Sequence, residues 1–313
     1  MKIVFLDAKT IGEDIDLSGF DALGEVVKYG FSTAEEARER SKDADVLILN
    51  KVQVNEQTIG EADHLKLVCV TATGTNNLDK EYLDKRGITW RNVAGYSTES
   101  VAQHTFAMLF YLLEKLPYYD NYVKSEKYVN DVSFTHFAKA FHELSGMTYG
   151  IIGLGNIGRR VADIAKAFGC RVIYYSTSGR NSQPGYERVS FDELLEQSDI
   201  VSIHAPLDEN TLGLMNKEAF AKMKKSAILL NVGRGPIINE ADLAEALNNK
   251  TIAAAGLDVL SVEPMQEDNP LRGIKDSERL LITPHIAWAG VEARNRLMGI
   301  ILGQIKEFFK AHE

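Results

Sequence analysis

The sequence predicts an α/β protein built from two doubly wound parallel sheets, and three observations support this prediction. Short apolar runs rich in Val, Ile and Leu alternate with helix-length amphipathic stretches along most of the chain. A glycine-rich fingerprint opens the second series of such units. The length of 313 residues exceeds the usual size of one domain and therefore favours two.

The first series of β/α units occupies the N-terminal third of the chain. Its four predicted strands are residues 2–7, 45–50, 65–70 and 88–93. Polar, helix-length segments such as residues 32–43 separate these apolar runs. Strands that alternate with helices in this way form a parallel sheet.

A long helix is predicted at residues 98–116, between the two series. It is apolar on nearly all faces past Gln103, which indicates burial between layers or between subunits. Residues 117–146 are less regular and rich in aromatic side chains. We interpret this stretch as a connecting arm and not as a domain.

The second series contains six predicted strands, enough for a complete dinucleotide-binding sheet. They are residues 147–155, 170–176, 199–205, 227–233, 253–259 and 280–286. The final segment, residues 291–312, is predicted to be one amphipathic helix.

The bulk composition argues against several classes of function. The chain has 35 Lys and Arg against 44 Asp and Glu, a formal net charge of −9, so no nucleic-acid or anionic-membrane partner is expected. Only Cys69 and Cys170 occur, each in an apolar run, and neither disulfides nor a metal site are expected. Without a signal-peptide pattern or an apolar stretch of about 18–20 residues, the expected location is cytoplasmic.

A dinucleotide site is predicted where the first strand of the second series runs into a glycine turn and a helix. Glycines at these positions allow a tight turn, close approach of the backbone to a pyrophosphate, and helix packing on the strand. The helix N-terminus favours anions. The predicted contacts to NAD(H) or NADP(H) are Gly153, Gly155, Asn156, Ile157 and Gly158.

The next strand ends on Ser176, where an Asp or Glu that binds the adenosine ribose is expected. Thr177, Ser178 and Arg180 follow, and they complete the predicted cofactor contacts here. Hydroxyls and an Arg can bind a 2′-phosphate that a carboxylate would repel. The alternative is a solvated turn with NAD bound adequately. The sequence therefore leaves NAD and NADP as alternatives, with a small preference for NADP use.

Three polar residues lie at or just beyond strand ends in the second series: Arg234, Glu263 and His285. Strand C-termini of a doubly wound sheet line one crevice, so these residues can converge. An Arg can clamp the oxygens of a 2-keto acid, a His can donate a proton, and a carboxylate can orient that His. Singly, each has a simpler explanation as an interface contact, a helix cap or a satisfied strand-end histidine. Together they predict a catalytic acid/base site.

The chain resembles the D-isomer-specific 2-hydroxyacid dehydrogenases over nearly its whole length. The resemblance rests on GIIGLGNIG, HAPLDENTLGLMN, NVGRGPIINEADLAEAL, GLDVLSVEP and TPHIAW, in that order. It implies that Arg234 binds substrate and that Glu263 and His285 form the acid/base pair. It also implies that Asp258 meets the nicotinamide side of the cofactor. The positions implied to line the cofactor groove are His204, Pro206 and Gly233.

The same resemblance implies the domain organisation. A flavodoxin-like substrate domain, residues 1–98 and 287–313, would flank an inserted Rossmann domain, residues 99–286. In the loop after the third predicted strand, the backbone at Thr73 and Gly74 would receive the substrate carboxylate, although an ordinary glycine turn is the alternative. A homodimer formed through the nucleotide domain is expected.

Two segments, ATGTNNLD and TPHIAWA with a following EAR, resemble the glycerate dehydrogenase/hydroxypyruvate reductase branch. That likeness implies reduction of hydroxypyruvate or glyoxylate to D-glycerate or glycolate. Glu263 counts against the formate dehydrogenase relatives, which pair Gln with the His. The alternatives are another D-2-hydroxy acid, such as D-lactate, or a nucleotide-sensing binding protein of the corepressor type.

Overall fold

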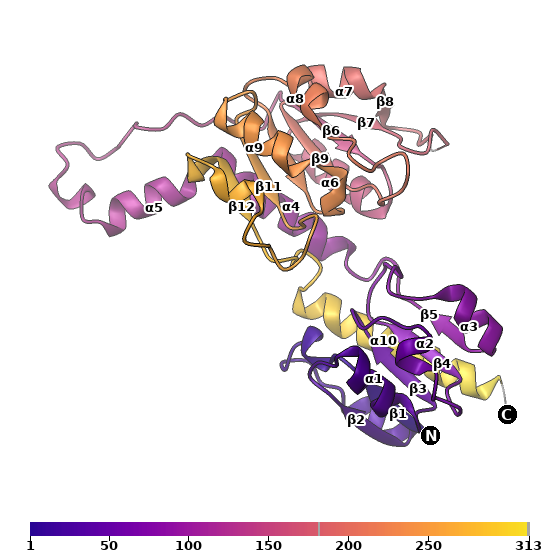
Figure 1. Cartoon of the computed structure of the whole chain (residues 1–313). Helices are drawn as coiled ribbons and strands as arrows, with labels where there is room; N and C mark the ends of the chain where they lie inside the picture. The colour runs from indigo at the N-terminus through magenta and orange to yellow at the C-terminus, as the bar shows by residue number, and fades with distance from the viewer. Residues whose placement is uncertain (181, 312–313) are drawn as a thin grey trace. The chain divides into compact units, whose positions relative to one another are not determined.

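The computed structural model describes residues 1–180 and 182–311, and the chain divides into two compact units (Figure 1). Unit 1 comprises residues 1–97 and the C-terminal segment from Ala289, and unit 2 comprises residues 98–288. Residues 98, 287 and 288, which the sequence places in the first unit, belong to unit 2. One reason is that the backbone N–H of Ala287 donates to the Asp258 carboxylate of unit 2.

Unit 1 contains a five-stranded parallel sheet with the order β2-β1-β3-β4-β5, which is the flavodoxin-like arrangement. Its strands are β1 (Lys2–Phe5), β2 (Glu25–Lys28), β3 (Val46–Leu49), β4 (Leu67–Val70) and β5 (Thr89–Arg91). The central strands β3 and β4 are fully buried, as their unbroken apolar runs predict. The edge strand β2 was not predicted, because its EVVK sequence is only half-buried and is not a continuous apolar run.

Four helices belong to this unit. Three are short and have side-chain caps: α1 (Ala34–Ser41), α2 (Glu56–Ile59) and α3 (Lys80–Arg86). The C-terminal α10 (Val291–Lys310) is long and has no side-chain cap, and 3₁₀ turns lie at Ala8–Thr10 and Ser18–Leu23. Helix α1 begins with a capping box in which Thr33 and Glu36 satisfy each other's backbone N–H groups. Such caps offset the poor intrinsic stability of helices this short.

Unit 2 contains a seven-stranded parallel sheet with the order β12-β11-β10-β9-β6-β7-β8. Its strands are β6 (Thr148–Ile152), β7 (Arg171–Tyr175), β8 (Glu187–Arg188), β9 (Ile200–Ile203), β10 (Ile228–Asn231), β11 (Ala254–Leu257) and β12 (Leu280–Ile282). Six were predicted, and the two-residue exposed edge strand β8 was not. The chain reverses direction across the sheet between β6 and β9, which is where Rossmann sheets bind ligands.

Helices pack on both faces of this sheet, and each face forms one buried apolar cluster with its helices. They are α4 (Thr98–Leu113), α6 (Asn156–Ala167), α7 (Phe191–Gln197), α8 (Lys217–Lys222) and α9 (Glu240–Asn248), with 3₁₀ turns at Gly235–Ile237, Pro270–Gly273 and Ser277–Arg279. Helix α4 contacts α6 and the strands β10 and β11, which buries one side of it, whereas Ala107 and Tyr111 on its other side are exposed.

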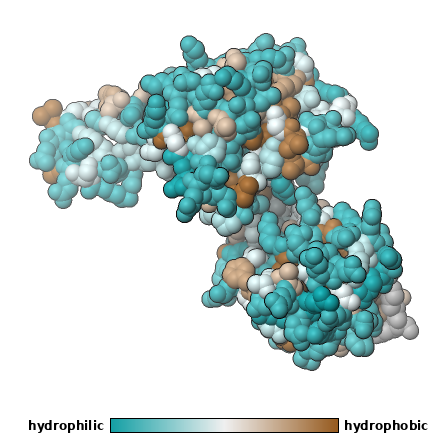
Figure 2. Space-filling view, in the orientation of Figure 1, coloured by the Kyte–Doolittle hydropathy of each residue, from teal (hydrophilic) through white to brown (hydrophobic). Residues whose placement is uncertain are grey.

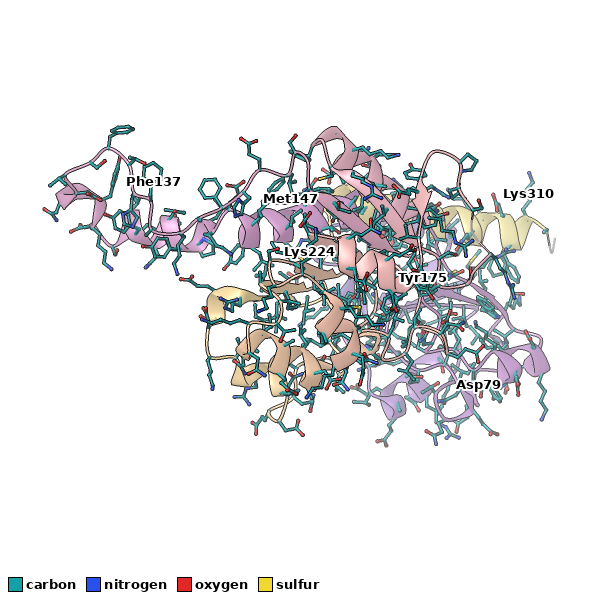
Figure 3. The ribbon with its side chains drawn as sticks, turned by 90° about the horizontal axis from the view of Figure 1, so that it is seen from above. Asp79, Phe137, Met147, Tyr175, Lys224 and Lys310 are labelled. Atoms are coloured by element: carbon teal, nitrogen blue, oxygen red, sulfur yellow. The ribbon has the colours of Figure 1, made fainter. Side chains whose placement is uncertain are left out.

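Residues 116–143 form an arm that projects from unit 2, as Figure 1 shows. It contains helix α5 (Leu116–Lys124) and a 3₁₀ turn at Tyr128–Asn130, which the sequence did not predict. The rings of Tyr122 and His136 stack with centroids 3.8 Å apart and thereby fold the arm on itself. Phe137 lies in the arm, away from Tyr175 at the end of β7 (Figure 3).

Both cysteines lie in buried positions. Burial raises the pKa of the Cys69 thiol to about 12 and that of Cys170 to about 11. Among the described helices, none is both long and apolar enough to cross a bilayer.

Candidate active site

The turn between β6 and α6 has the geometry of a nucleotide-binding loop. Gly153 has a φ of +91°, and a Cβ there would lie 2.8 Å from the Ala205 backbone. A Cβ on Gly158 would lie 2.3 Å from the carbonyl oxygen of Gly153. Both positions therefore require glycine, as the fingerprint predicts.

The start of α6 offers free backbone donors. Gly155 caps the helix without a side-chain hydrogen bond, and no heavy atom lies within 4 Å of the position of a Cβ on Gly155. The N–H groups of Asn156, Ile157 and Gly158 are in the first turn and have no acceptor within the helix. The arrangement fits an anionic group such as a dinucleotide pyrophosphate.

At the end of β7, Ser176 is 4% exposed, and its buried Oγ has no hydrogen-bond partner among the described residues. Buried hydroxyls rarely lack a hydrogen-bond partner, so the unpaired Oγ indicates that a ligand group forms a hydrogen bond with it. Thr177 is half-buried, whereas Ser178 and Arg180 are exposed. No carboxylate is present from residue 176 to residue 180, so this edge fits a ribose bearing either a hydroxyl or a phosphate.

The predicted groove residues lie at the carboxyl ends of β9 and β10, close to the glycine turn. The backbone N–H of His204 donates to Ile152 of β6 (2.8 Å), and its Nε2 bonds with the hydroxyl of Ser202 (2.9 Å). Pro206 is exposed, and Gly233 is half-buried at the turn after β10. All three are placed beside the nucleotide turn, on the same edge of the sheet.

His204 is neutral, because burial lowers its pKa to about 3. The unfolded chain takes up a proton near pH 6.5 that the folded chain does not. The free energy of unfolding therefore falls by up to about 1.4 kcal/mol per pH unit as the pH drops below that value. We expect His204→Gln to lose this contribution, so that urea unfolding between about pH 7 and pH 5 has a shallower pH dependence than in wild type. Equal slopes in the two proteins would contradict the prediction.

Arg234 follows β10 in a turn that is fixed from two sides. Buried Asn231 accepts a hydrogen bond from the N–H of Gly233 (3.0 Å) and donates to the carbonyl of Arg234 (2.9 Å). A Cβ on Gly235 would lie 1.9 Å from the carbonyl carbon of Leu260, so this turn sits directly against the loop after β11.

The guanidinium of Arg234 is half-buried and donates from Nη1 to the Gly233 carbonyl (2.7 Å). Within the part of the chain that the structure describes, no carboxylate forms an ion pair with it. A planar cation held at a sheet edge without a carboxylate partner suits recognition of a substrate carboxylate.

Glu263 and His285 lie in direct contact. His285 Nδ1 is 2.7 Å from Glu263 Oε2, and Glu263 Oε1 accepts the N–H of Leu260 (3.0 Å). An ionised carboxylate only accepts hydrogen bonds, so the proton between them resides on Nδ1. Nε2 is then the nitrogen that can deliver a proton, and both side chains stay partly exposed.

Asp258 is 1% exposed and is directed towards the loop that carries His285. Its Oδ1 accepts from the Thr283 hydroxyl (2.6 Å) and the N–H of Ile286 (2.9 Å), and its Oδ2 accepts from the N–H of Ala287 (2.8 Å). The contact of Asp258 with a nicotinamide stays a prediction. Asn231 and Thr283 were missed by sequence reasoning, although each is a polar residue at a strand end close to a predicted site residue.

In unit 1, the loop after β4 presents two backbone N–H groups that have no acceptor in the part of the chain that the structure describes. The Thr73 hydroxyl donates to the Val93 carbonyl (3.0 Å), and the Asn92 amide donates to the Thr73 carbonyl (2.6 Å). These bonds fix the loop, while the N–H groups of Thr73 and Gly74 have no acceptor among the described residues. A loop of this kind suits a carboxylate ligand.

Comparison with known proteins gives consistent matches. The model of the "D-isomer specific 2-hydroxyacid dehydrogenase, NAD binding domain" family matches residues 106–287. A hydroxypyruvate reductase from Blautia hydrogenotrophica is 39% identical, with 99% of this chain and 97% of the relative covered.

Two solved structures have the same fold. D-lactate dehydrogenase from Aquifex aeolicus, complexed with NAD and lactic acid, is 27% identical with a TM-score of 0.84, over 99% of this chain and 96% of that one. The acyclic imino acid reductase Bsp5, in complex with NADPH and D-arginine, is 28% identical with a TM-score of 0.86, over 99% and 98%. The chain therefore belongs to the D-isomer-specific 2-hydroxyacid dehydrogenase family, in its glycerate dehydrogenase/hydroxypyruvate reductase branch.

Proposed function

We propose that this NAD(P)-dependent dehydrogenase reduces a short 2-keto acid, hydroxypyruvate or glyoxylate, to D-glycerate or glycolate. The observation that carries the proposal is the 2.7 Å contact between His285 Nδ1 and Glu263 Oε2, which leaves Nε2 to act as the acid. The full-length likeness to a hydroxypyruvate reductase supports this choice of substrate.

When bound, a nicotinamide cofactor would supply the hydride. The other roles belong to side chains of this protein. Arg234 binds the carboxylate and ketone oxygens through its fork and polarises the carbonyl. The Nε2–H of His285 passes its proton to the ketone oxygen as that oxygen gains charge. Glu263 keeps its hydrogen bond to Nδ1 throughout, which orients the ring and leaves Nε2 free to face the ketone oxygen. In unit 1, the N–H groups of Thr73 and Gly74 are proposed donors to a carboxylate group.

A panel of 2-keto acids assayed with NADH and with NADPH tests the proposal. We expect kcat/KM for hydroxypyruvate or glyoxylate to exceed that for pyruvate. Faster turnover of pyruvate would favour a D-lactate-like enzyme. A purified, folded protein that turns over none of these acids with either cofactor would refute the proposal.

For the cofactor, we propose that NADPH is accepted, because the buried Ser176 hydroxyl and the following hydroxyls replace the ribose-binding acid. In Ser176→Asp, the new carboxylate would repel a 2′-phosphate and bind a ribose diol instead. We expect the Kd for NADPH to rise about tenfold or more, with the Kd for NADH unchanged or lower. Fluorescence titration measures both constants. An unchanged Kd for NADPH would show that the phosphate does not bind at this edge.

We further propose a cytoplasmic homodimer that forms through unit 2. The arm exposes large apolar side chains, among them Val132, Phe134 and Phe137, and Phe168 is 45% exposed on the body of unit 2. Figure 2 shows hydrophobic residues at the end of the arm. Surfaces of this kind usually mark an interface.

If the protein is a homodimer, a double variant of the arm should have a lower mass in solution than wild type. We expect Phe134→Ser combined with Phe137→Ser to weaken the dimer and raise its dissociation constant, since each change removes an apolar anchor. Light scattering after size exclusion measures the mass. A wild-type protein that is monomeric at every concentration would contradict the homodimer.

A further inference from the structure

We propose that Thr283 and Asp258, supported by His104 of helix α4, are positioning residues that hold the His285 loop in its reactive conformation. The inference rests on the acid/base role proposed for His285. No sequence motif assigned a role to His104 or Thr283. The four residues lie in unit 2 and are linked by hydrogen bonds or close contacts.

The loop needs such support because His285 has a left-handed backbone, with a φ of +56°. A side-chain-bearing residue adopts this conformation only when its surroundings impose it. The N–H of His285 donates to the backbone carbonyls of Asp258 (2.8 Å) and Thr283 (2.9 Å). These two bonds hold the residue against the ends of β11 and β12.

The carboxylate of Asp258 holds the next two residues. Its two oxygens accept the N–H groups of Ile286 and Ala287, so three consecutive backbone N–H groups of the loop donate to Asp258. The carboxylate is 1% exposed, and a buried charge is stable only when hydrogen bonds surround it. The Thr283 hydroxyl is the side-chain donor that completes this set.

The direction of each bond follows from the chemistry of the groups. The Thr283 hydroxyl has one hydrogen, which it donates to Asp258 Oδ1 at 2.6 Å. Its oxygen is 3.0 Å from His104 Nε2, so Nε2 must carry a hydrogen and donate it. His104 Nε2 also lies 3.6 Å from Asp258 Oδ1. His104 therefore orients the hydroxyl and adds a further polar hydrogen close to the buried carboxylate.

These hydrogen bonds fix the position of His285, the proposed acid. Loss of the Thr283 hydroxyl leaves Asp258 short of a donor and loosens the loop, which displaces His285 from Glu263 and from the substrate. A displacement of about 1 Å at a reacting group is enough to cost a large factor in rate. The glycine turn at the cofactor site is not part of these contacts, so binding of the dinucleotide through that turn should be spared.

The test compares Thr283→Val, which keeps the shape and removes the hydroxyl, with Thr283→Ser, which keeps the hydroxyl. We expect Thr283→Val to lower kcat about tenfold while the KM for the keto acid and the Kd for NADH stay within about twofold. Thr283→Ser should restore kcat to within about twofold of wild type. His104→Leu and His104→Gln form a second pair, because the Gln amide can replace the Nε2 donor.

A matched control is Thr105→Val, which removes another buried hydroxyl from α4. Among the described residues, that hydroxyl bonds only with the Val101 carbonyl of its own helix, so kcat should not change. A second readout needs no turnover: the NMR resonance of the His285 Nδ1–H proton should shift in Thr283→Val and return in Thr283→Ser.

Two results would overturn the inference. One is a Thr283→Val enzyme with wild-type kcat and an unshifted His285 resonance. The other is an equal loss of kcat in Thr283→Ser, which would show that the hydroxyl is not the active element. If wild type turns over no keto acid, the proposed function fails, and the resonance still decides whether Thr283 positions His285.

Discussion

Replacement of His285 by Asn is expected to lower kcat for keto-acid reduction by about a thousandfold or more while NADH binding stays within a few-fold of wild type. Asn is chosen because it tolerates the left-handed backbone at this position better than Ala does. The amide cannot protonate a ketone oxygen, yet it leaves the hydrogen bonds of the loop in place. Stopped-flow or steady-state assays with saturating cofactor measure the loss.

His64→Asn is a suitable control, because His64 is an exposed histidine of unit 1. It should have wild-type kinetics. If His285→Asn retained more than about a tenth of wild-type kcat, His285 would not be the acid. If it failed to fold, as circular dichroism would show, the histidine would be structural instead.

Replacement of Arg234 by Gln is expected to lower kcat/KM for the keto acid by about a hundredfold to a thousandfold, since two charge-assisted hydrogen bonds of roughly 1.5–3 kcal/mol each are weakened. Arg234→Lys should recover only part of this loss, because an ammonium group has the charge without the planar fork. Initial rates over a range of keto-acid concentrations give the values.

The arginine control is Arg38→Gln in unit 1, where Arg38 forms an exposed ion pair with Glu61. Its removal should leave kcat/KM unchanged, since exposed pairs contribute little. A kcat/KM for Arg234→Gln within about threefold of wild type would remove Arg234 from the substrate site. The Kd for NADH should not change in either variant.

Much of the fold is predictable because buried parallel strands have unbroken apolar runs. The strands β3, β4, β9 and β10 are all fully buried, and each lies inside a predicted run. The strands β2 and β8 were missed for the converse reason. They lie at sheet edges, where half-buried or exposed residues give no apolar signal.

The candidate site was predictable only in part. The glycines of the nucleotide turn could be predicted from the sequence. Another part of the backbone lies so close to them that there is no room for a Cβ. The contact between His104 and Thr283 joins residues 179 positions apart, and no local pattern encodes it. The left-handed backbone of His285 is likewise a product of tertiary hydrogen bonds and not of local sequence.

The two buried cysteines have a practical consequence for measuring movement in this enzyme. A thiol reacts with maleimide or iodoacetamide as the thiolate, and burial keeps Cys69 and Cys170 protonated and out of reach. The native protein therefore needs no cysteine removal before labelling. One cysteine introduced at an exposed arm position such as Val129 would be the single reactive thiol, and a fluorophore there would report on the arm in an otherwise unaltered chain.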